Sequence, residues 1–216
     1  VGMVTDAFSL QSFAIAVIDS LRHGVELEAR SAGDGGRSAR IRFLPEAGLE
    51  AVTVDAETPI QWMSAEQSNS SLVIGTHAVL KIVRRVTAGI HPESEMTRRL
   101  TQLGFRNTAA LLGEVVRVDE DGTPHTLMLV QQYVDNQGDA WNWTLEYLRR
   151  TLDDAALTDE SLEDYGKELR GYATLAAAMG RRLAELHAAL ALPCDDPAFA
   201  PARATAVWYR ERDSRA

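Results

Sequence analysis

A single lysine interrupts an apolar strand pattern at residues 79–85, VLKIVRR. Side chains alternate between the two faces of a strand, so Lys81 shares one face with Val79 and Val83. The chain has only two lysines, Lys81 and Lys167, among its 22 basic residues. A charged amine that is buried without a partner costs several kcal/mol, roughly, so position 81 needs a carboxylate or an anionic ligand close by.

The segment 91–104, HPESEMTRRLTQLG, predicts a helix that could supply this carboxylate. A proline at its start, acidic residues in its first turn and a glycine at its end are typical helix signals. Its apolar stripe is expected to consist of Met96, Leu100 and Leu103. Glu95 lies next to this stripe and Glu93 lies farther round, so Glu95 is the predicted partner of Lys81. Alternatively, Glu95 only complements the helix N-terminus beside Glu93.

The order of the remaining elements predicts a sheet with one helix inserted. Polar turns at SNSS (68–71) and GT (75–76) divide residues 60–85 into three strands of an antiparallel meander. After the helix, residues 113–118 and 125–134 flank the turn DEDGTP and form a hairpin.

Upstream of the meander, residues 8–22 predict a helix. Residues 24–30 and 38–48 flank the glycine-rich turn GDGG and predict a hairpin. A short strand is expected at 52–59, with a soft domain boundary near residue 57.

From residue 135 onward the signals are helical, around 143–152 and from 160 to 192. The second segment carries an apolar seam that consists of Tyr165, Leu169, Tyr172, Ala176, Met179, Leu183, Leu186 and Leu190. Three heptads are the lower limit for a coiled coil, so a core helix of a helical lobe is favoured over coiled-coil dimerisation. The tail 193–216 is expected to be loop-like, with a further element beginning around 204–212.

Composition excludes several classes of protein. A net charge of −9 disfavours nucleic acid as a partner, and no apolar run reaches the roughly 18 residues of a membrane span. The lone Cys194 excludes an internal disulfide and, with no signal peptide recognised, suits the cytoplasm. The five histidines lack the spacing of zinc ligands. Walker, dinucleotide-binding, serine-hydrolase and zincin motifs are missing.

Three strands, a helix and two strands, followed by helices, are the order of a protein-kinase-like N-lobe, in which a strand lysine pairs with a helix glutamate. The resemblance becomes specific at EQSNSS (66–71), LKIVRR (80–85), GIHPESE (89–95) and NQGDAWNWTL (136–145). These segments resemble the bacterial maltokinases, which phosphorylate maltose with ATP and are often fused to, or work with, trehalose synthase.

The resemblance implies an α+β fold in three parts. Residues 1–57 would be a small α/β cap subdomain. Residues 58–134 would be the kinase-like N-lobe, with its antiparallel sheet, one helix, nucleotide loop and hinge. Residues 135–216 would begin an incomplete helical C-lobe.

The resemblance also implies roles for individual residues. A polar loop would cover the phosphates of ATP, and it consists of Gln67, Ser68, Asn69, Ser70 and Ser71. Lys81 would hold the α- and β-phosphates, and Glu95 would orient Lys81. At the hinge, the Gln132 carbonyl and the Val134 amide would bind adenine.

The sequence departs from the family where catalysis would occur. A kinase-like catalytic loop needs an aspartate and, five residues later, an asparagine for Mg²⁺. No asparagine follows Asn142, so the catalytic aspartate and the Mg²⁺ ligands are expected beyond residue 216, and the chain is expected to transfer no phosphate alone. Two alternatives stay open: a non-catalytic kinase-like module attached to trehalose synthase, and an aminoglycoside or other small-molecule phosphotransferase.

Overall fold

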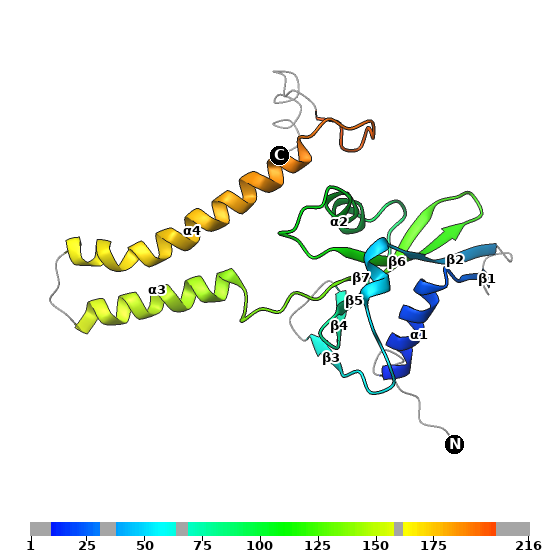
Figure 1. Cartoon of the computed structure of the whole chain (residues 1–216), viewed down its shortest axis with the longest axis horizontal. Helices are drawn as coiled ribbons and strands as arrows, with labels where there is room; N and C mark the ends of the chain where they lie inside the picture. The colour runs from blue at the N-terminus through cyan, green and yellow to red at the C-terminus, as the bar shows by residue number, and fades with distance from the viewer. Residues whose placement is uncertain (1–9, 31–37, 64–68, 158–161, 202–216) are drawn as a thin grey trace. The chain divides into compact units, whose positions relative to one another are not determined.

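The structure is a computed structural model that describes residues 10–30, 38–63, 69–157 and 162–201 (Figure 1). It forms two compact units, residues 1–136 and 137–216. The first unit is α+β and is built on a seven-stranded antiparallel sheet. None of the described helices combines the length and the apolar character needed to cross a bilayer.

The sheet has the strand order β1-β2-β6-β7-β5-β4-β3. Its strands are β1 (Glu26–Arg30), β2 (Ser38–Pro45), β3 (Ile60–Met63), β4 (Asn69–Ile74), β5 (Ala78–Val83), β6 (Leu111–Asp119) and β7 (Pro124–Gln132). The β3-β4-β5 meander and the β1-β2 and β6-β7 hairpins confirm the predicted strand pairings. The turn GDGG lies outside the described residues.

Strand β2 joins the amino-terminal segment to the rest of the sheet, because it pairs with β6 from Ala39 opposite Asp119 to Pro45 opposite Gly113. Helix α1 (Gln11–Arg22) covers one face of this sheet. Its buried side chains pack with the apolar residues of β4, β5 and β7 in one core, which includes Leu72, Leu80 and Val130. The expected cap and the expected lobe are therefore continuous through one sheet and one core. The division at residue 57 stays a prediction.

Residues 52–59 do not form the predicted strand. They follow the 3₁₀-helix η2 (Ala47–Ala51) and make a turn around Asp55, whose Oδ1 accepts hydrogen bonds from the Thr58 hydroxyl at 2.8 Å and the Glu57 amide at 3.0 Å. These bonds, that from Thr58 first, lower the pKa of Asp55 below its usual value. An aspartate that bonds to its own local backbone favours a turn over a strand ladder.

Helix α2 (Pro92–Gln102) lies between β5 and β6 in the chain and confirms the predicted helix. Pro92 stands at its start. Gly104 follows its end with φ +67°, a left-handed conformation that glycine adopts without strain.

The second unit contains α3 (Ala140–Leu157) and α4 (Leu162–Leu190), as the helical signals predicted. Trp143 and Tyr147 of α3 stack with centroids 5.3 Å apart, and Tyr172 of α4 lies 6.3 Å from Trp143. The apolar seam of α4 is only partly covered within the described residues, since Leu183 is 53% exposed.

At Gly113, β6 comes close to the Leu21 side chain of α1. A Cβ at this position would lie 3.1 Å from both methyl groups of Leu21 and 3.2 Å from the Leu44 carbonyl oxygen. We expect Gly113→Ala to lower the free energy of unfolding by about 1–3 kcal/mol, because the backbone and the fully buried Leu21 must move apart. Urea unfolding followed by circular dichroism measures this.

The control is Gly180→Ala in α4, where a Cβ would meet nothing within 4 Å. Alanine favours a helix over glycine, so this variant should be neutral or more stable. Equal effects at the two positions would contradict the close approach at Gly113.

Candidate functional site

Lys81 lies in β5, near the middle of the sheet. It is opposite Ser71 of β4 on one side and Leu129 of β7 on the other. Its chain neighbours Leu80 and Ile82 point into the core under α1. Lys81 therefore lies on the face that α1 does not cover, and its side chain is 20% exposed.

The partner of this lysine is Glu93, in the first turn of α2. Lys81 Nζ lies 2.8 Å from Glu93 Oε1. The side-chain amide of Gln131 donates to the same Glu93 oxygen at 3.2 Å and to the Thr97 hydroxyl at 3.4 Å. Two donors from two neighbouring strands thus hold one carboxylate oxygen, an arrangement that fixes both the charge and its orientation.

The prediction that Glu95 pairs with Lys81 is wrong. It assumed a buried stripe through Met96, but Met96 is 41% exposed and α2 buries Ser94, Thr97 and Leu100. The buried face is therefore rotated toward Glu93. Apolar periodicity misses a helix face that is largely polar.

Gln131 is a site residue that the sequence analysis did not identify. It lies two positions after Leu129 in β7 and so shares the face of Lys81, and it is 8% exposed. A buried amide needs hydrogen-bond partners. A polar residue at alternating spacing in an apolar strand was the signal that could have identified it.

Only part of the predicted phosphate loop lies within the described residues, and that part belongs to a strand. Gln67 and Ser68 lie outside the described residues. The loop prediction is wrong for Asn69, Ser70 and Ser71, which belong to β4 because they pair with Val83, Ile82 and Lys81. Ser71 is fully buried beside Lys81, and the Ser70 hydroxyl accepts a hydrogen bond from Arg84 Nε at 3.0 Å.

The predicted hinge lies at the end of β7. The Gln132 amide donates to the Ala110 carbonyl at 2.8 Å, and the Tyr133 amide donates to the His77 carbonyl at 3.0 Å. Val134 follows and is 54% exposed, and its carbonyl accepts from the Asn136 side chain at 2.9 Å. The first unit ends here, at Asn136. Adenine binding by Gln132 and Val134 stays a prediction.

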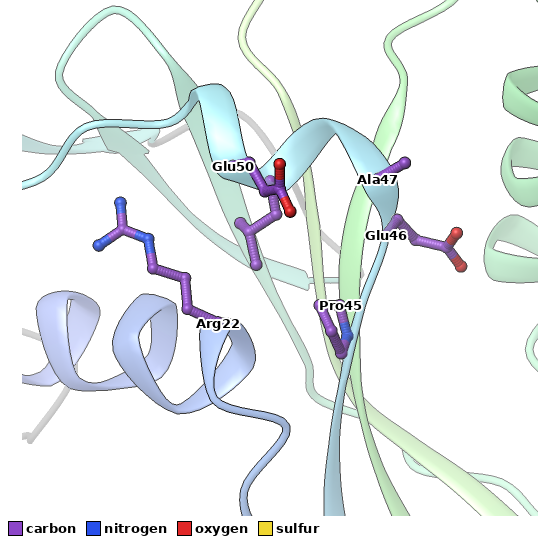
Figure 2. Close-up of a pocket in the computed structure, with 6 residues that line it drawn as sticks. Arg22, Pro45, Glu46, Ala47 and Glu50 are labelled. Atoms are coloured by element: carbon purple, nitrogen blue, oxygen red, sulfur yellow. The ribbon is translucent and has the colours of Figure 1, made fainter.

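A pocket of about 500 Å³ lies elsewhere in the first unit (Figure 2). It is lined by Arg22, Pro45, Glu46, Ala47, Leu49 and Glu50. The Arg22 guanidinium donates to the Val52 carbonyl and pairs with Asp19 at 3.0 Å. The walls come from α1, the end of β2 and η2, whereas Lys81 and Glu93 belong to β5 and α2. The pocket and the ion pair are therefore different features.

Metal binding finds no support in the described part of the chain. Nowhere in it do three His, Cys, Asp or Glu side chains come together in a way that could hold a metal ion. The Mg²⁺ ligands that the kinase resemblance implies were expected beyond residue 216, so the Mg²⁺ site stays a prediction, and no step is assigned to that ion.

Two curated proteins to which the chain is similar are named glucosamine kinases. The chain is 27% identical over 139 residues to a glucosamine kinase of Mycolicibacterium smegmatis (strain ATCC 700084 / mc(2)155), which covers 64% of this chain and 31% of that protein. It is 29% identical over 168 residues to a glucosamine kinase of Streptacidiphilus jiangxiensis, with 76% and 35% covered. The chain therefore spans about a third of the length of these curated relatives. No family model matches it.

Solved structures share the fold. A glucosamine kinase in complex with glucosamine, ADP and inorganic phosphate matches with a TM-score of 0.58 at 21% identity, over 94% of this chain and 40% of that chain. A second crystal form of a glucosamine kinase gives a TM-score of 0.57 at 20% identity, with 94% and 39% covered. The kinase-like α+β fold is thus established, whereas a specific likeness to maltokinases is not.

Glu93 and Glu95 allow a matched test of the ion pair, because both stand in the first turn of α2. We expect Glu93→Gln to lower the free energy of unfolding by about 1 kcal/mol, since it leaves Lys81 partly buried beside a neutral amide. Glu95→Gln should stay within about 0.5 kcal/mol of the wild type. Both changes remove one charge from the helix N-terminus, so the difference in denaturation midpoint reports the ion pair. Equal losses would contradict the pairing.

Proposed function

We propose that the chain carries the nucleotide-binding part of an ATP-dependent sugar phosphotransferase. The observation that carries the proposal is the Lys81–Glu93 ion pair on the sheet face beside α2. Kinases use such a pair to hold the α- and β-phosphates of ATP. The glucosamine kinases to which the chain is similar support a sugar as the acceptor.

Each residue in the proposal acts by binding or by orientation. The Lys81 ammonium binds the phosphate oxygens as a compact positive charge. Glu93, which is itself held by Gln131, keeps that ammonium on the α2 side of β5. The lysine is therefore already ordered before the nucleotide binds, and binding loses less conformational entropy. Gln67, Ser68, Asn69, Ser70 and Ser71 contact the phosphates, and Gln132 and Val134 contact adenine through their backbone.

The proposed acceptor sugar is taken from the glucosamine kinases and not from the resemblance to maltokinases. Both curated relatives are named for glucosamine, and a structural neighbour holds glucosamine with ADP and phosphate. These names mention neither maltose nor trehalose synthase. We therefore propose glucosamine as the first acceptor to test and maltose as the second. The catalytic aspartate is proposed to lie in a part of the full protein that this chain does not supply.

Replacing Lys81 tests nucleotide binding by this chain directly. We expect Lys81→Ala to weaken ADP binding about tenfold in calorimetric titration, because one charge-assisted contact to the phosphates is lost. Lys167→Ala removes the only other lysine and is the matched control, with unchanged affinity. Equal affinities for ADP in all three proteins would contradict a phosphate-binding role for Lys81.

Activity is tested on the full-length protein with a panel of sugars. We expect ATP-dependent release of ADP with glucosamine and a weaker or no response with maltose. Lys81→Ala should lower the rate of ADP release about a hundredfold or more, because phosphate positioning dominates phosphoryl transfer. A coupled assay for ADP measures it. A folded full-length protein that phosphorylates no sugar would favour the non-catalytic module instead.

A further inference from the structure

Helix α2 buries a largely polar face against the sheet. Among its eleven residues only one apolar side chain, Leu100, is buried, while Ser94 and Thr97 fill the rest of the buried face. The position of a helix with so little apolar contact depends on specific hydrogen bonds and ion pairs. Whatever fixes α2 also fixes Glu93, because Glu93 stands on it.

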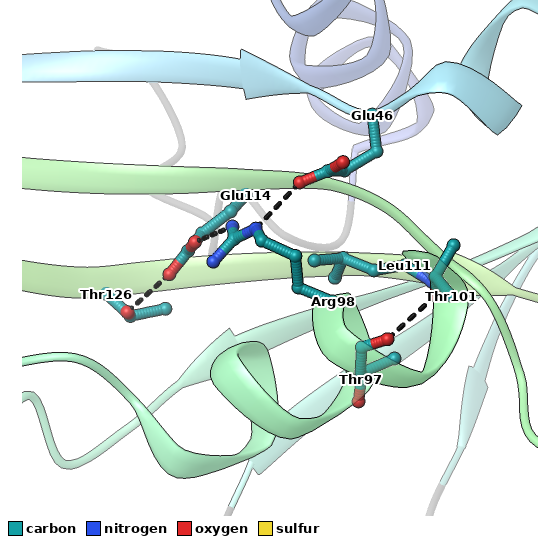
Figure 3. A network of polar contacts seen from close by, with 7 residues as sticks. All are labelled: Glu46, Thr97, Arg98, Thr101, Leu111, Glu114 and Thr126. Carbon is teal, nitrogen blue, oxygen red and sulfur yellow. Dashed lines mark hydrogen bonds and ion pairs between the residues drawn. The ribbon is translucent and has the colours of Figure 1, made fainter. Parts of the chain in front are cut away.

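The second polar contact of α2 is made by Arg98 (Figure 3). Arg98 Nε lies 2.7 Å from Glu46 Oε1, and Arg98 Nη2 lies 2.5 Å from Glu114 Oε2. The other oxygen of Glu114 accepts a hydrogen bond from the Thr126 hydroxyl at 2.6 Å. One guanidinium thus joins the helix to β6 and to the residue that follows β2.

Part of this cluster is buried, so its charged groups need partners. Glu114 is 5% exposed, so its charge needs Arg98 nearby. Burial alone lowers the pKa of Arg98, but the hydrogen bonds and charges of Glu46 and Glu114 outweigh it and raise that pKa above its usual value. Arg98 therefore stays charged, and its two donor groups keep a defined direction.

Glu46 is itself fixed to the sheet. Its amide donates to the Leu112 carbonyl at 2.9 Å, immediately after β2 ends at Pro45. In Figure 2 the carboxylate of Glu46 points away from Arg22, on the side of the pocket opposite α1. The amino-terminal segment thus presents one carboxylate to α2 from a rigid position.

Both polar contacts of α2 are made with residues that lie in one row across the sheet. Lys81, Leu129 and Glu114 are direct neighbours across β5, β7 and β6. Lys81 and Glu114 are therefore two strand spacings apart, about 10 Å. Glu93 and Arg98 are five residues apart on the helix, a rise of about 7.5 Å. One rigid helix spans both contacts, so a shift at Arg98 moves Glu93.

We propose that Arg98 is a positioning residue, which together with Glu46 and Glu114 sets α2 so that Glu93 meets Lys81. The proposal deepens the nucleotide-binding role proposed for Lys81 and rests on it only for its functional meaning. It assigns the amino-terminal segment a task at the site: Glu46, more than thirty residues before Lys81, helps to orient that lysine. Glu46 acts through Arg98 and is not a catalytic residue.

The test exploits the two lysines of the chain. Lysine labelled with ¹³C at Cε gives two signals in a carbon–proton spectrum, and Lys81→Arg assigns them. Glu93→Gln supplies the spectrum of Lys81 without its ion pair. We expect Arg98→Met to move the Lys81 signal more than half of the way to its Glu93→Gln position, and Glu46→Gln to move it in the same direction by a smaller amount. Lys167, in the second unit, should not move.

Two controls separate positioning from general damage. Glu50→Gln removes a charge from the same part of the surface, four residues after Glu46, and should leave the Lys81 signal unchanged. Arg98→Lys keeps the charge but loses the two-pronged geometry of the guanidinium, so the Lys81 signal should lie between its wild-type and its Arg98→Met positions. Should Arg98→Met fail to fold, Glu46→Gln decides. A Lys81 signal that stays in place in folded Arg98→Met, or in folded Glu46→Gln where Arg98→Met does not fold, would overturn the proposal.

Nucleotide affinity distinguishes this proposal from the proposed function. If the wild-type chain binds ADP, Glu46→Gln should weaken binding roughly fivefold, a typical size for coupling through a packed network. If the wild-type chain binds no ADP, the nucleotide role fails, while the lysine spectra still decide whether Arg98 positions Glu93.

Discussion

The contact between the Lys81 ammonium and the Glu93 carboxylate, 2.8 Å apart, is the constraint around which the first unit is arranged. A charged amine in a central strand has to find a partner, and in the described chain that partner comes from the helix inserted between β5 and β6. The same face of the sheet carries two more polar side chains, Gln131 and Glu114, beside the buried Leu129. The apolar face is left for α1 to cover.

The sheet separates two kinds of packing. On the side of α1, four buried apolar residues of the helix, Ala14, Val17, Ile18 and Leu21, join a continuous hydrophobic core. On the side of α2, ion pairs and side-chain hydrogen bonds join the helix to the sheet beside the buried Leu100. Apolar burial is tolerant of small shifts, whereas charge-assisted hydrogen bonds need defined distances. The large apolar cluster therefore lies on the α1 side, and the charged contacts of the site lie on the α2 side.

Much of this fold could be predicted from the sequence because strand alternation, turn residues and helix ends are local signals. The meander, both hairpins and α2 follow from them. The partner of Lys81 could not, because α2 buries serine and threonine, so the apolar stripe indicated the wrong face. The strand expected at 52–59 failed for another local reason: the Asp55 side chain bonds to its own backbone. The hydroxyl-rich stretch 69–71 looked like a loop until its pairing with β5 was known.

The signs of the charges under α2 also give the helix a direction. The sheet offers a cation at Lys81 and an anion at Glu114, and the helix answers with an anion at Glu93 and a cation at Arg98. A helix laid down in reverse would set carboxylate against carboxylate and guanidinium against ammonium. Like charges in partly buried positions repel strongly. The order of these four charges thus favours one direction of a short, mostly polar helix on the sheet and disfavours the reverse direction.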